Sequence, residues 1–311
     1  MISFYYDSIL CTGGSGLVGQ YLQKRLKPNF LPNIHYISSK DYDLCNMDDV
    51  KKMMNKYKPK VVIHLAARVG GIVENIKHPV DFYEQNVLMN TNVLQQCHEH
   101  NVEKVIGIIS TCAYPDVVEK YPMVEDDLFN GRPPETNFSY AFAKRAMAAQ
   151  IDAYVKQYNK KWCYLIPCNL YGEFDKFDPE RSHFVSALLQ KIMDADDKIQ
   201  LFGTGKPLRQ FMYADDLAKL IVLMLNADIV QNFNVATDEI YSIKEIAEIA
   251  LNALDEDLEI EFDETKPDGQ YRKDVSCKKL LSHFPHFGFT PLSAGIEKVY
   301  NAMMIQKNNG Q

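Results

Sequence analysis

Tyr140 and Lys144 stand four residues apart in a stretch, residues 137–158, whose apolar pattern predicts a helix, so their side chains share one face. A phenol can give or take a proton, and an ammonium beside it favours the phenolate and lowers its pKa from about 10 towards neutrality. Ser110 stands at the end of a predicted strand and adds a hydroxyl donor. The three residues together predict acid–base chemistry.

A glycine-rich segment near the start of the chain predicts a dinucleotide site. Gly13, Gly16 and Gly19 follow a predicted strand at residues 8–12 and open a predicted helix that reaches about residue 26. Glycine permits the tight turn and the close approach of a pyrophosphate to the helix N-terminus. The predicted cofactor contacts are Gly13, Ser15, Gly16, Leu17, Val18, Gly19, Ser39, Lys40, Ala66, Ala67, Tyr140, Lys144 and His183.

The segment Ser38-Ser39-Lys40-Asp41 occupies the place where such folds read the cofactor's ribose. Lys40 and the serine hydroxyls suit the 2′-phosphate of NADPH, whereas Asp41 would select NAD by binding the 2′-hydroxyl. We favour NADPH, with Asp41 as the competing candidate.

The elements that must position these residues alternate between buried strands and helices. Apolar runs at residues 34–38, 60–65, 105–110 and 163–167 predict further strands, and residues 47–57, 79–100 and 137–158 predict helices. This alternation is typical of an α/β fold, a Rossmann-type doubly wound parallel sheet.

The pattern changes after residue 170 and predicts a smaller, discontinuous C-terminal lobe. A turn-rich stretch from 171 to 179 precedes predicted helices at 183–195, 215–225, 242–254 and 292–304 and a strand at 258–262. We expect residues 1–170 plus about 210–237 to form the NADP(H)-binding domain. About 171–209 plus 238–311 would then form a lobe that binds a nucleotide sugar across the cleft.

Composition narrows the class of protein. The chain has 311 residues and a net charge of −7, which argues against a nucleic-acid-binding protein, and no apolar run is long enough to span a membrane. The N-terminus lacks the features of a signal peptide. Seven cysteines without C-x-x-C spacing predict free thiols rather than a disulfide framework or a metal site, and therefore a cytoplasmic protein.

Several longer segments resemble the GDP-L-fucose synthases, which are extended short-chain dehydrogenase/reductases. The resemblance extends from about residue 10 to the last predicted helix, and its most specific segments are STCAYP (110–115), NLYG (169–172), SHF (182–184), FGTGKPLR (202–209) and KPDGQYRK (266–273). It implies epimerisation of a GDP-4-keto-6-deoxy sugar at C3 and C5, followed by NADPH-dependent reduction at C4.

The resemblance also implies roles for individual residues. It assigns Cys112 and His183 to the proton exchange at C3 and C5, and a thiol and an imidazole both titrate near enough to neutrality for that task. Ser110, Tyr140 and Lys144 complete the predicted catalytic set, with Tyr140 donating the proton during reduction.

The second lobe is expected to supply the contacts to the nucleotide sugar. Arg209 and Lys273 are the candidates for the diphosphate, because a guanidinium fork and an ammonium both bind phosphate oxygens. Asn169 and Phe202 complete the predicted substrate site. Family members commonly carry tryptophan where this chain has Phe202, so a contact that needs an indole N–H is lost.

Two other functions remain open at this stage. The first is C4 reduction of another GDP-4-keto sugar, such as a 6-deoxy-heptose, with little or no epimerisation. The second is a non-catalytic NADP(H)-binding regulator, which the presence of both Tyr140 and Lys144 disfavours. The resemblance further implies a homodimer formed through the helices predicted at 79–100 and 137–158.

Overall fold

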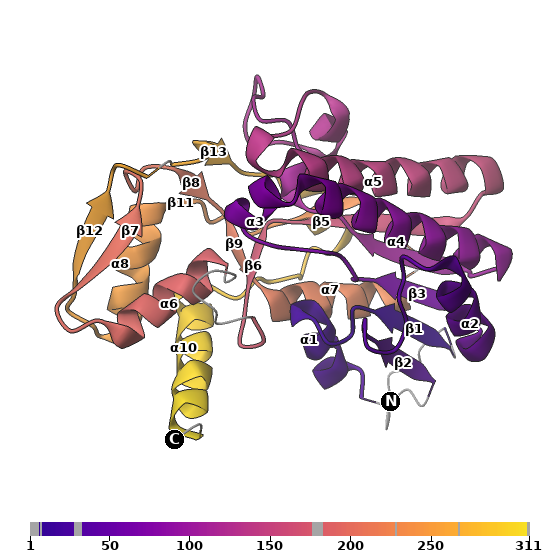
Figure 1. Ribbon diagram of the computed structural model, residues 1–311, viewed down its shortest axis with the longest axis horizontal. Coiled ribbons are helices and arrows are strands. Elements are labelled where there is room, and N and C mark those ends of the chain that lie inside the picture. The colour runs from indigo at the N-terminus through magenta and orange to yellow at the C-terminus, as the bar shows by residue number, and fades with distance from the viewer. Residues whose placement is uncertain are drawn as a thin grey trace.

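The computed structural model describes residues 6, 8–27, 33–175, 183–227, 229–266 and 268–309. At its centre is a parallel sheet in the order β10-β5-β4-β3-β1-β2 (Figure 1). Its strands are β1 (Ile9–Thr12), β2 (Ile34–Ile37), β3 (Val61–His64), β4 (Lys104–Ile108), β5 (Lys161–Pro167) and β10 (Phe233–Val235). The predicted doubly wound α/β fold is therefore confirmed.

Helices cover both faces of this sheet (Figure 1). On one face α4 (Pro79–Glu99) packs against both α2 (Met47–Tyr57) and α5 (Phe138–Tyr158), and on the other α1 (Leu17–Arg25) packs against α7 (Ala214–Asn226). The three helices predicted at 47–57, 79–100 and 137–158 agree with α2, α4 and α5 to within one residue. The short helix α3 (Ile72–Lys77) precedes α4.

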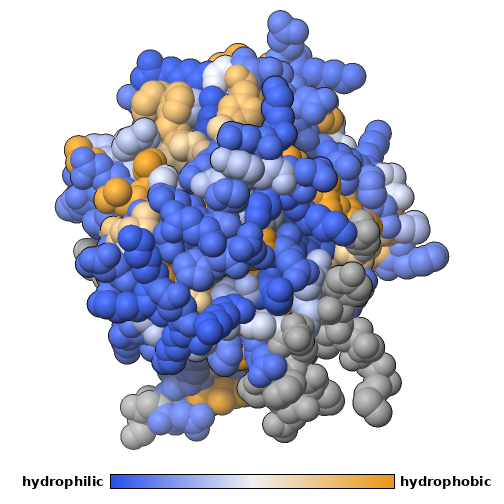
Figure 2. Space-filling view, turned by 90° about the vertical axis from the view of Figure 1, so that its right-hand side faces the viewer, coloured by the Kyte–Doolittle hydropathy of each residue, from blue (hydrophilic) through white to orange (hydrophobic). Residues whose placement is uncertain are grey.

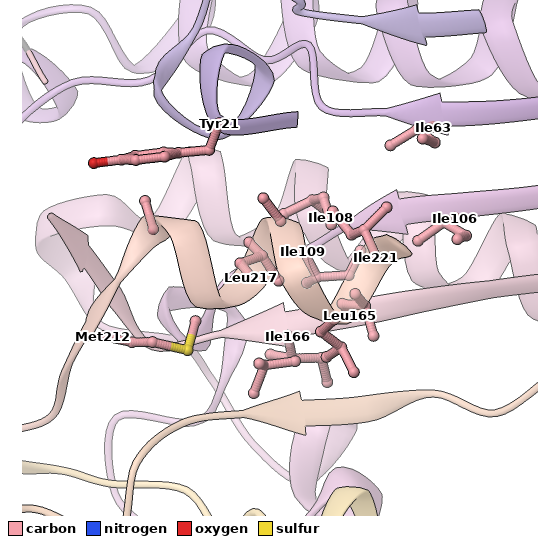
Figure 3. Packing of buried hydrophobic residues seen from close by; sticks show 14 of the residues in the cluster. Tyr21, Ile63, Ile106, Ile108, Ile109, Leu165, Ile166, Met212, Leu217 and Ile221 are labelled. Carbon is pink, nitrogen blue, oxygen red and sulfur yellow. The ribbon is translucent and has the colours of Figure 1, made fainter. Parts of the chain in front are cut away.

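The core lies between the sheet and these helices. Strands β1, β3 and β4 are buried along their whole length, which explains why their sequences are mainly apolar and do not alternate with polar residues. Figure 3 shows Leu217 and Ile221 of α7 packed over Ile108, Leu165 and Ile166. Full burial of one such side chain contributes about 1.5–3 kcal/mol, so this packing fixes the sheet edge from which the functional loops emerge.

A second group of elements lies beyond one end of the sheet, at the left of Figure 1. It contains α6 (Phe184–Asp194), α8 (Ile243–Leu254) and α10 (Leu292–Asn309) and the strand pair β12 (Glu259–Asp263) and β7 (Lys198–Phe202). It also contains a small sheet in the order β11-β8-β13, formed by β11 (Tyr241–Ser242), β8 (Leu208–Arg209) and β13 (Arg272–Lys273).

Short connecting elements complete the fold. They are the parallel pair β6 (Asn169–Tyr171) and β9 (Phe211–Tyr213), the helix α9 (Lys278–His283), and the 3₁₀ turns η1 (Thr111–Ala113), η2 (Glu125–Phe129) and η3 (Glu135–Asn137). The sequence did not predict the two- and three-residue strands, because so few residues show no periodicity. The turn-rich stretch predicted to reach residue 179, and Ser182 of the SHF segment, extend into residues 176–182, which lie outside the described residues.

The surface at the right of Figure 1 is mostly hydrophilic, with hydrophobic residues in small separate areas (Figure 2). Among the helices of the described residues, none is both long and apolar enough to cross a membrane.

Candidate active site

The loop after β1 is a turn that requires glycine. Gly13 has φ +71°, and a Cβ at this position would lie 2.7 Å from the backbone nitrogen of Ala66. At Gly19 in α1, a Cβ would lie 2.5 Å from the carbonyl oxygens of Gly13 and Gly14. Gly14, which the sequence analysis did not single out, is equally restricted, because its Cβ would meet that of Tyr36 at 2.7 Å. The glycine doublet directly after the strand was the signal for it.

The start of α1 suits an anionic group. Its N-cap, Gly16, offers no side-chain hydrogen bond, and the first turn contains no acidic residue. The first backbone N–H groups of a helix have no acceptor within the helix and carry the positive end of its dipole. The predicted contacts Ser15, Leu17 and Val18 lie at this terminus. The loop and the helix therefore fit the pyrophosphate of a dinucleotide.

The turn after β2 contains both candidate residues for binding the cofactor's ribose, Lys40 and Asp41. The Asp41 carboxylate accepts hydrogen bonds from the backbone N–H and the hydroxyl of Ser38, both at 2.8 Å, and these bonds lower its pKa. Asp41 therefore closes its own turn, while Ser39 and Lys40 are exposed. This arrangement favours Ser39 and Lys40 as the contacts to a 2′-phosphate.

The loop after β3 is fixed to the loop after β1 by a buried network. Thr12 Oγ1 lies 2.7 Å from His64 Nδ1, and His64 Nε2 lies 3.0 Å from Asn90 Oδ1 on α4. Burial lowers the pKa of His64 to about 4, so the imidazole is neutral near pH 7. The Ala66 N–H donates to Thr12 Oγ1 at 3.3 Å, which places Ala66 and its neighbour Ala67 at the switch point between β1 and β3.

Ser110 and Cys112 lie just beyond β4. The strand ends at Ile108, two residues earlier than predicted, and Ser110 caps the turn η1 by accepting a hydrogen bond from the Cys112 N–H at 3.2 Å. Both residues are half-buried. The capped turn places the hydroxyl and the thiol side by side at the carboxyl edge of the sheet.

Tyr140 and Lys144 lie in the first two turns of α5, and the structure corrects one expectation about them. Burial, reinforced by negative charge at Cys112, raises the pKa of the Tyr140 phenol, so the predicted net lowering of this pKa is wrong. The Lys144 Nζ lies 5.7 Å from the centre of the Tyr140 ring and donates to the Ile108 carbonyl oxygen at 2.7 Å. Tyr140 is accordingly a neutral proton donor near pH 7.

Burial also affects Lys144. It lowers the pKa of the ammonium to about 8, so Lys144 loses its charge in a moderately basic range.

Cys112 has a cation beside its sulfur. The Lys273 Nζ donates to Cys112 Sγ at 3.0 Å, across 161 residues of sequence. Burial of the thiol opposes its ionisation, but the charge and hydrogen bond of Lys273, with hydrogen bonds from Ser110 and Asn137, bring its pKa below the ordinary value. Lys273 was predicted to contact a diphosphate, and the structure shows it against the thiol.

Arg209 lies next to Lys273, because β8 and β13 pair in parallel with these two residues in register. Its guanidinium donates to the Leu208 carbonyl oxygen at 2.9 Å. Burial lowers the pKa of Arg209, and negative charge at Cys112 and Asp268 opposes that shift. The small sheet thus presents two adjacent cations to η1.

His183 belongs to a separate cluster at the start of α6, where it is the N-cap residue. Its Nδ1 lies 3.0 Å from Asp175 Oδ1, and Ser186 donates to Asp175 Oδ2 at 2.7 Å. The imidazole is half-exposed while the Asp175 carboxylate is buried. Asp175 therefore orients His183 so that the Nε2 edge of the ring is turned away from the carboxylate. The sequence analysis predicted His183 but not Asp175.

The two remaining predicted substrate residues, Asn169 and Phe202, contact residues other than the catalytic candidates. Asn169 in β6 is half-buried and donates to the Gln210 carbonyl oxygen at 2.9 Å. Phe202, at the end of β7, is 63% exposed, and the ammonium groups of Lys191 and Lys266 lie 5.2 and 5.9 Å from its ring centre. The structure therefore groups Ser110, Cys112, Tyr140, Lys144, Arg209 and Lys273, whereas His183, Asn169 and Phe202 make their own contacts to other residues.

Known proteins are similar to this chain over nearly its whole length. The family model described as "NAD dependent epimerase/dehydratase family" matches residues 9–236. A GDP-L-fucose synthase from Dictyostelium discoideum is 38% identical over 299 residues, which cover 94% of this chain and 93% of the relative. The chain belongs to the GDP-L-fucose synthase family.

Solved structures agree with this assignment. A GDP-L-fucose synthetase from Naegleria fowleri bound to NADP is 32% identical, with a TM-score of 0.87 over 99% of this chain and 97% of the other. A GDP-6-OMe-4-keto-L-xylo-heptose reductase from C. jejuni is 25% identical, also with a TM-score of 0.87, over 97% and 98%. The family predicted from the sequence is confirmed.

Proposed function

We propose that this protein is an NADPH-dependent enzyme that epimerises a GDP-4-keto-6-deoxy sugar at C3 and C5 and reduces it at C4. The observation that carries the proposal is the cluster of Ser110, Cys112, Tyr140 and Lys144 at the sheet edge, in a chain similar over its whole length to GDP-L-fucose synthases. A reductase alone needs no second proton-transfer group there, whereas an enzyme that exchanges protons at carbon needs one, and a thiol beside a cation can fill that role.

The described residues fit NADPH. The loop at Gly13 leaves no room for a side chain, the start of α1 has free N–H groups, and Lys40 is exposed beside a turn that Asp41 closes. Bound NADPH supplies a hydride to C4. Lys144 and Tyr140 lie beside the same edge and would orient the nicotinamide half. We infer that Gly13, Ser15, Gly16, Leu17, Val18, Gly19, Ser39, Lys40, Ala66 and Ala67 hold the cofactor, with His183 closing the site.

Proton exchange comes first in the proposed sequence. A ketone at C4 makes the protons on C3 and C5 acidic, because the carbanion is stabilised as an enolate. Cys112 removes such a proton, and His183, held by Asp175, returns one from the opposite face. The Ser110 and Tyr140 hydroxyls donate to the enolate oxygen while it carries negative charge.

Reduction then uses Tyr140 as an acid. The raised pKa keeps the phenol protonated near pH 7, so it can give its proton to the C4 oxygen when the hydride arrives. The charge of Lys144 stabilises the phenolate that remains.

We place the nucleotide sugar across the cleft between the sheet domain, residues 1–170 plus about 210–237, and the second lobe, about 171–209 plus 238–311. Arg209 is the main contact to the diphosphate, with Asn169 beside the sugar and Phe202 at the outer rim. The partly buried guanidinium supports this role, because it has no carboxylate partner among the described residues and presents a planar fork to phosphate oxygens.

We further propose a cytoplasmic homodimer. All seven cysteines are free thiols, as expected in a reducing compartment. The long helices α4 and α5 carry exposed apolar side chains, among them Tyr83, Leu88 and Phe142, which a second copy would cover. Sedimentation equilibrium tests the dimer: a monomer at micromolar concentration would contradict it.

The alternative, a C4 reductase of a heptose without epimerisation, is not favoured. The heptose reductase from C. jejuni is less similar in sequence than the GDP-L-fucose synthetase from Naegleria fowleri, at 25% against 32% identity.

One experiment separates the two functions. The purified protein is incubated with GDP-4-keto-6-deoxymannose and NADPH in D₂O, and the product is assigned by NMR. The proposal predicts deuterium at C3 and C5 and the inverted configuration at both carbons. A reduced product without deuterium at either position would establish the simple C4 reductase instead.

A further inference from the structure

Lys273 is the last residue of the strand β13. Its ammonium faces the turn η1, which is 161 residues earlier in the sequence. Its neighbour across the small sheet is Arg209, so two cations stand side by side. Among the described residues no carboxylate lies within ion-pair distance of the Lys273 ammonium, and its hydrogen-bond partner is the sulfur of Cys112 at 3.0 Å.

The other groups that face Cys112 have a consistent electrostatic effect. The side chains of Ser110 and Asn137 donate hydrogen bonds to the sulfur. The nearby phenol of Tyr140 is neutral and adds no charge. Arg209 adds a second positive charge within electrostatic range. Cations and hydrogen-bond donors stabilise a thiolate, and the thiolate is the form of cysteine that accepts a proton.

We propose that Lys273 is a positioning residue that holds Cys112 as a thiolate before substrate binds, and so prepares the proton acceptor for epimerisation. The role of this thiolate in epimerisation rests on the proposed function. In this arrangement Arg209 is the main contact to the diphosphate, and Lys273 stabilises the negative charge on the Cys112 sulfur.

The proton step is balanced without any further reagent. The thiolate of Cys112 takes a proton from the carbon next to the C4 ketone, and the C–H electron pair moves into the enolate. Negative charge leaves the sulfur and appears on the C4 oxygen, where Ser110 and Tyr140 donate hydrogen bonds. The carbon receives its new proton from His183 on the opposite face, and the ammonium of Lys273 favours loss of the thiol proton to solvent, which restores the thiolate for the next turnover.

The first test measures the ionisation of Cys112 in the full chain without substrate. Alkylation by iodoacetamide is followed against pH by peptide mass spectrometry, which separates Cys112 from the other cysteines. Cys45 is the internal reference, because it is also half-buried but burial and Asp43 raise its pKa. We expect Cys112 to react with a midpoint below the ordinary thiol value of about 8.5.

Matched variants assign the effect to the ammonium. Lys273→Met should raise the midpoint by about one to two pH units, and Lys273→Arg should keep most of the wild-type value because it keeps the charge. Lys278→Met, which removes an exposed lysine five residues later, should leave the midpoint unchanged. An equal midpoint in Lys273→Met and wild type would overturn the role of Lys273. A wild-type midpoint at or above the ordinary value would overturn it even if the variant did not fold.

The second test links the thiolate to the reaction. With GDP-4-keto-6-deoxymannose and NADPH in D₂O, Lys273→Met should take up deuterium at C3 and C5 about tenfold more slowly at pH 7 and recover as the pH rises. A purely structural contact would lower the rate equally at every pH, which would contradict the proposal. Absence of deuterium uptake in wild type would instead contradict the proposed function, whatever the alkylation midpoints show.

Discussion

The two proton-transfer groups of the site are built in different ways. Tyr140 and Lys144 come from one helix, four residues apart, and Lys144 is anchored to the end of the adjacent strand β4. Cys112 and Lys273 come from segments 161 residues apart and meet only because β13 folds back over the sheet edge. The first pair depends on local helical geometry, and the second depends on the packing of the second lobe against the sheet.

This difference implies that the two half-reactions can be separated. Changes in the helical pair should affect the hydride step most and proton exchange less, because Tyr140 is only one of the two donors to the enolate oxygen. Changes around Cys112 should do the reverse.

The largest expected effect is that of Tyr140→Phe, which keeps the ring and removes the proton donor. C4 reduction should fall by about 10²–10⁴-fold, because a positioned general acid contributes that much. NADPH binding, followed by fluorescence titration, should persist. Tyr300→Phe on α10, which removes a phenol hydroxyl that contacts Glu256, is the control and should reduce at the wild-type rate. Near wild-type turnover in Tyr140→Phe would exclude the phenol as the donor.

A smaller effect is expected at the cofactor's ribose. Lys40→Glu replaces attraction to the 2′-phosphate by repulsion, so the kcat/KM ratio of NADPH to NADH should fall by about tenfold to a hundredfold. Lys51→Glu makes the same change of charge on the exposed side of α2 and should leave the ratio unchanged. Equal use of both cofactors by the wild type would contradict the NADPH assignment.

The pH profile of reduction tests the charge of Lys144. Its pKa is lowered to about 8, so the ammonium is present below this pH and is lost as the pH rises through it. Reduction in wild type should therefore fall by about tenfold per pH unit above about 8. Lys144→Arg keeps a charge throughout and should show no fall in that range. A flat wild-type profile from pH 7 to about 9.5 would argue against a catalytic ammonium.

The smallest effect is expected at Asp175, which acts on the reaction only through His183. Asp175→Asn should slow proton return by about tenfold and leave partly epimerised product, while hydride transfer stays near wild type. Asp194→Asn, at an exposed position near the other end of α6, is the control. Fully epimerised product from Asp175→Asn at the wild-type rate would show that His183 needs no such support.

The same contrast explains what the sequence could predict. The strands β1 to β5 and the helices α2, α4 and α5 were predicted because their apolar periodicity is strong and local. Tyr140 and Lys144 were found for the same reason, and Gly13, Gly16 and Gly19 because glycine at a strand end has few other uses.

Features set by long-range packing were not predicted. The short strands β8 and β13 have no period, so the register that pairs Lys273 with Arg209 could not be read from the sequence. The contact of Lys273 with Cys112, the support of His183 by Asp175 and the raised pKa of Tyr140 all follow from burial and from neighbours far away in the chain.

The most direct test of the separation is the product that Cys112→Ser forms in D₂O from GDP-4-keto-6-deoxymannose and NADPH. The substitution keeps the volume of the side chain and replaces a thiol, with a pKa of about 8.5, by a hydroxyl that does not ionise near neutrality. The account predicts a C4-reduced sugar without deuterium at C3 and C5, with both carbons in their starting configuration. Deuterium uptake equal to that of wild type at both carbons would contradict it and show that another residue is the base.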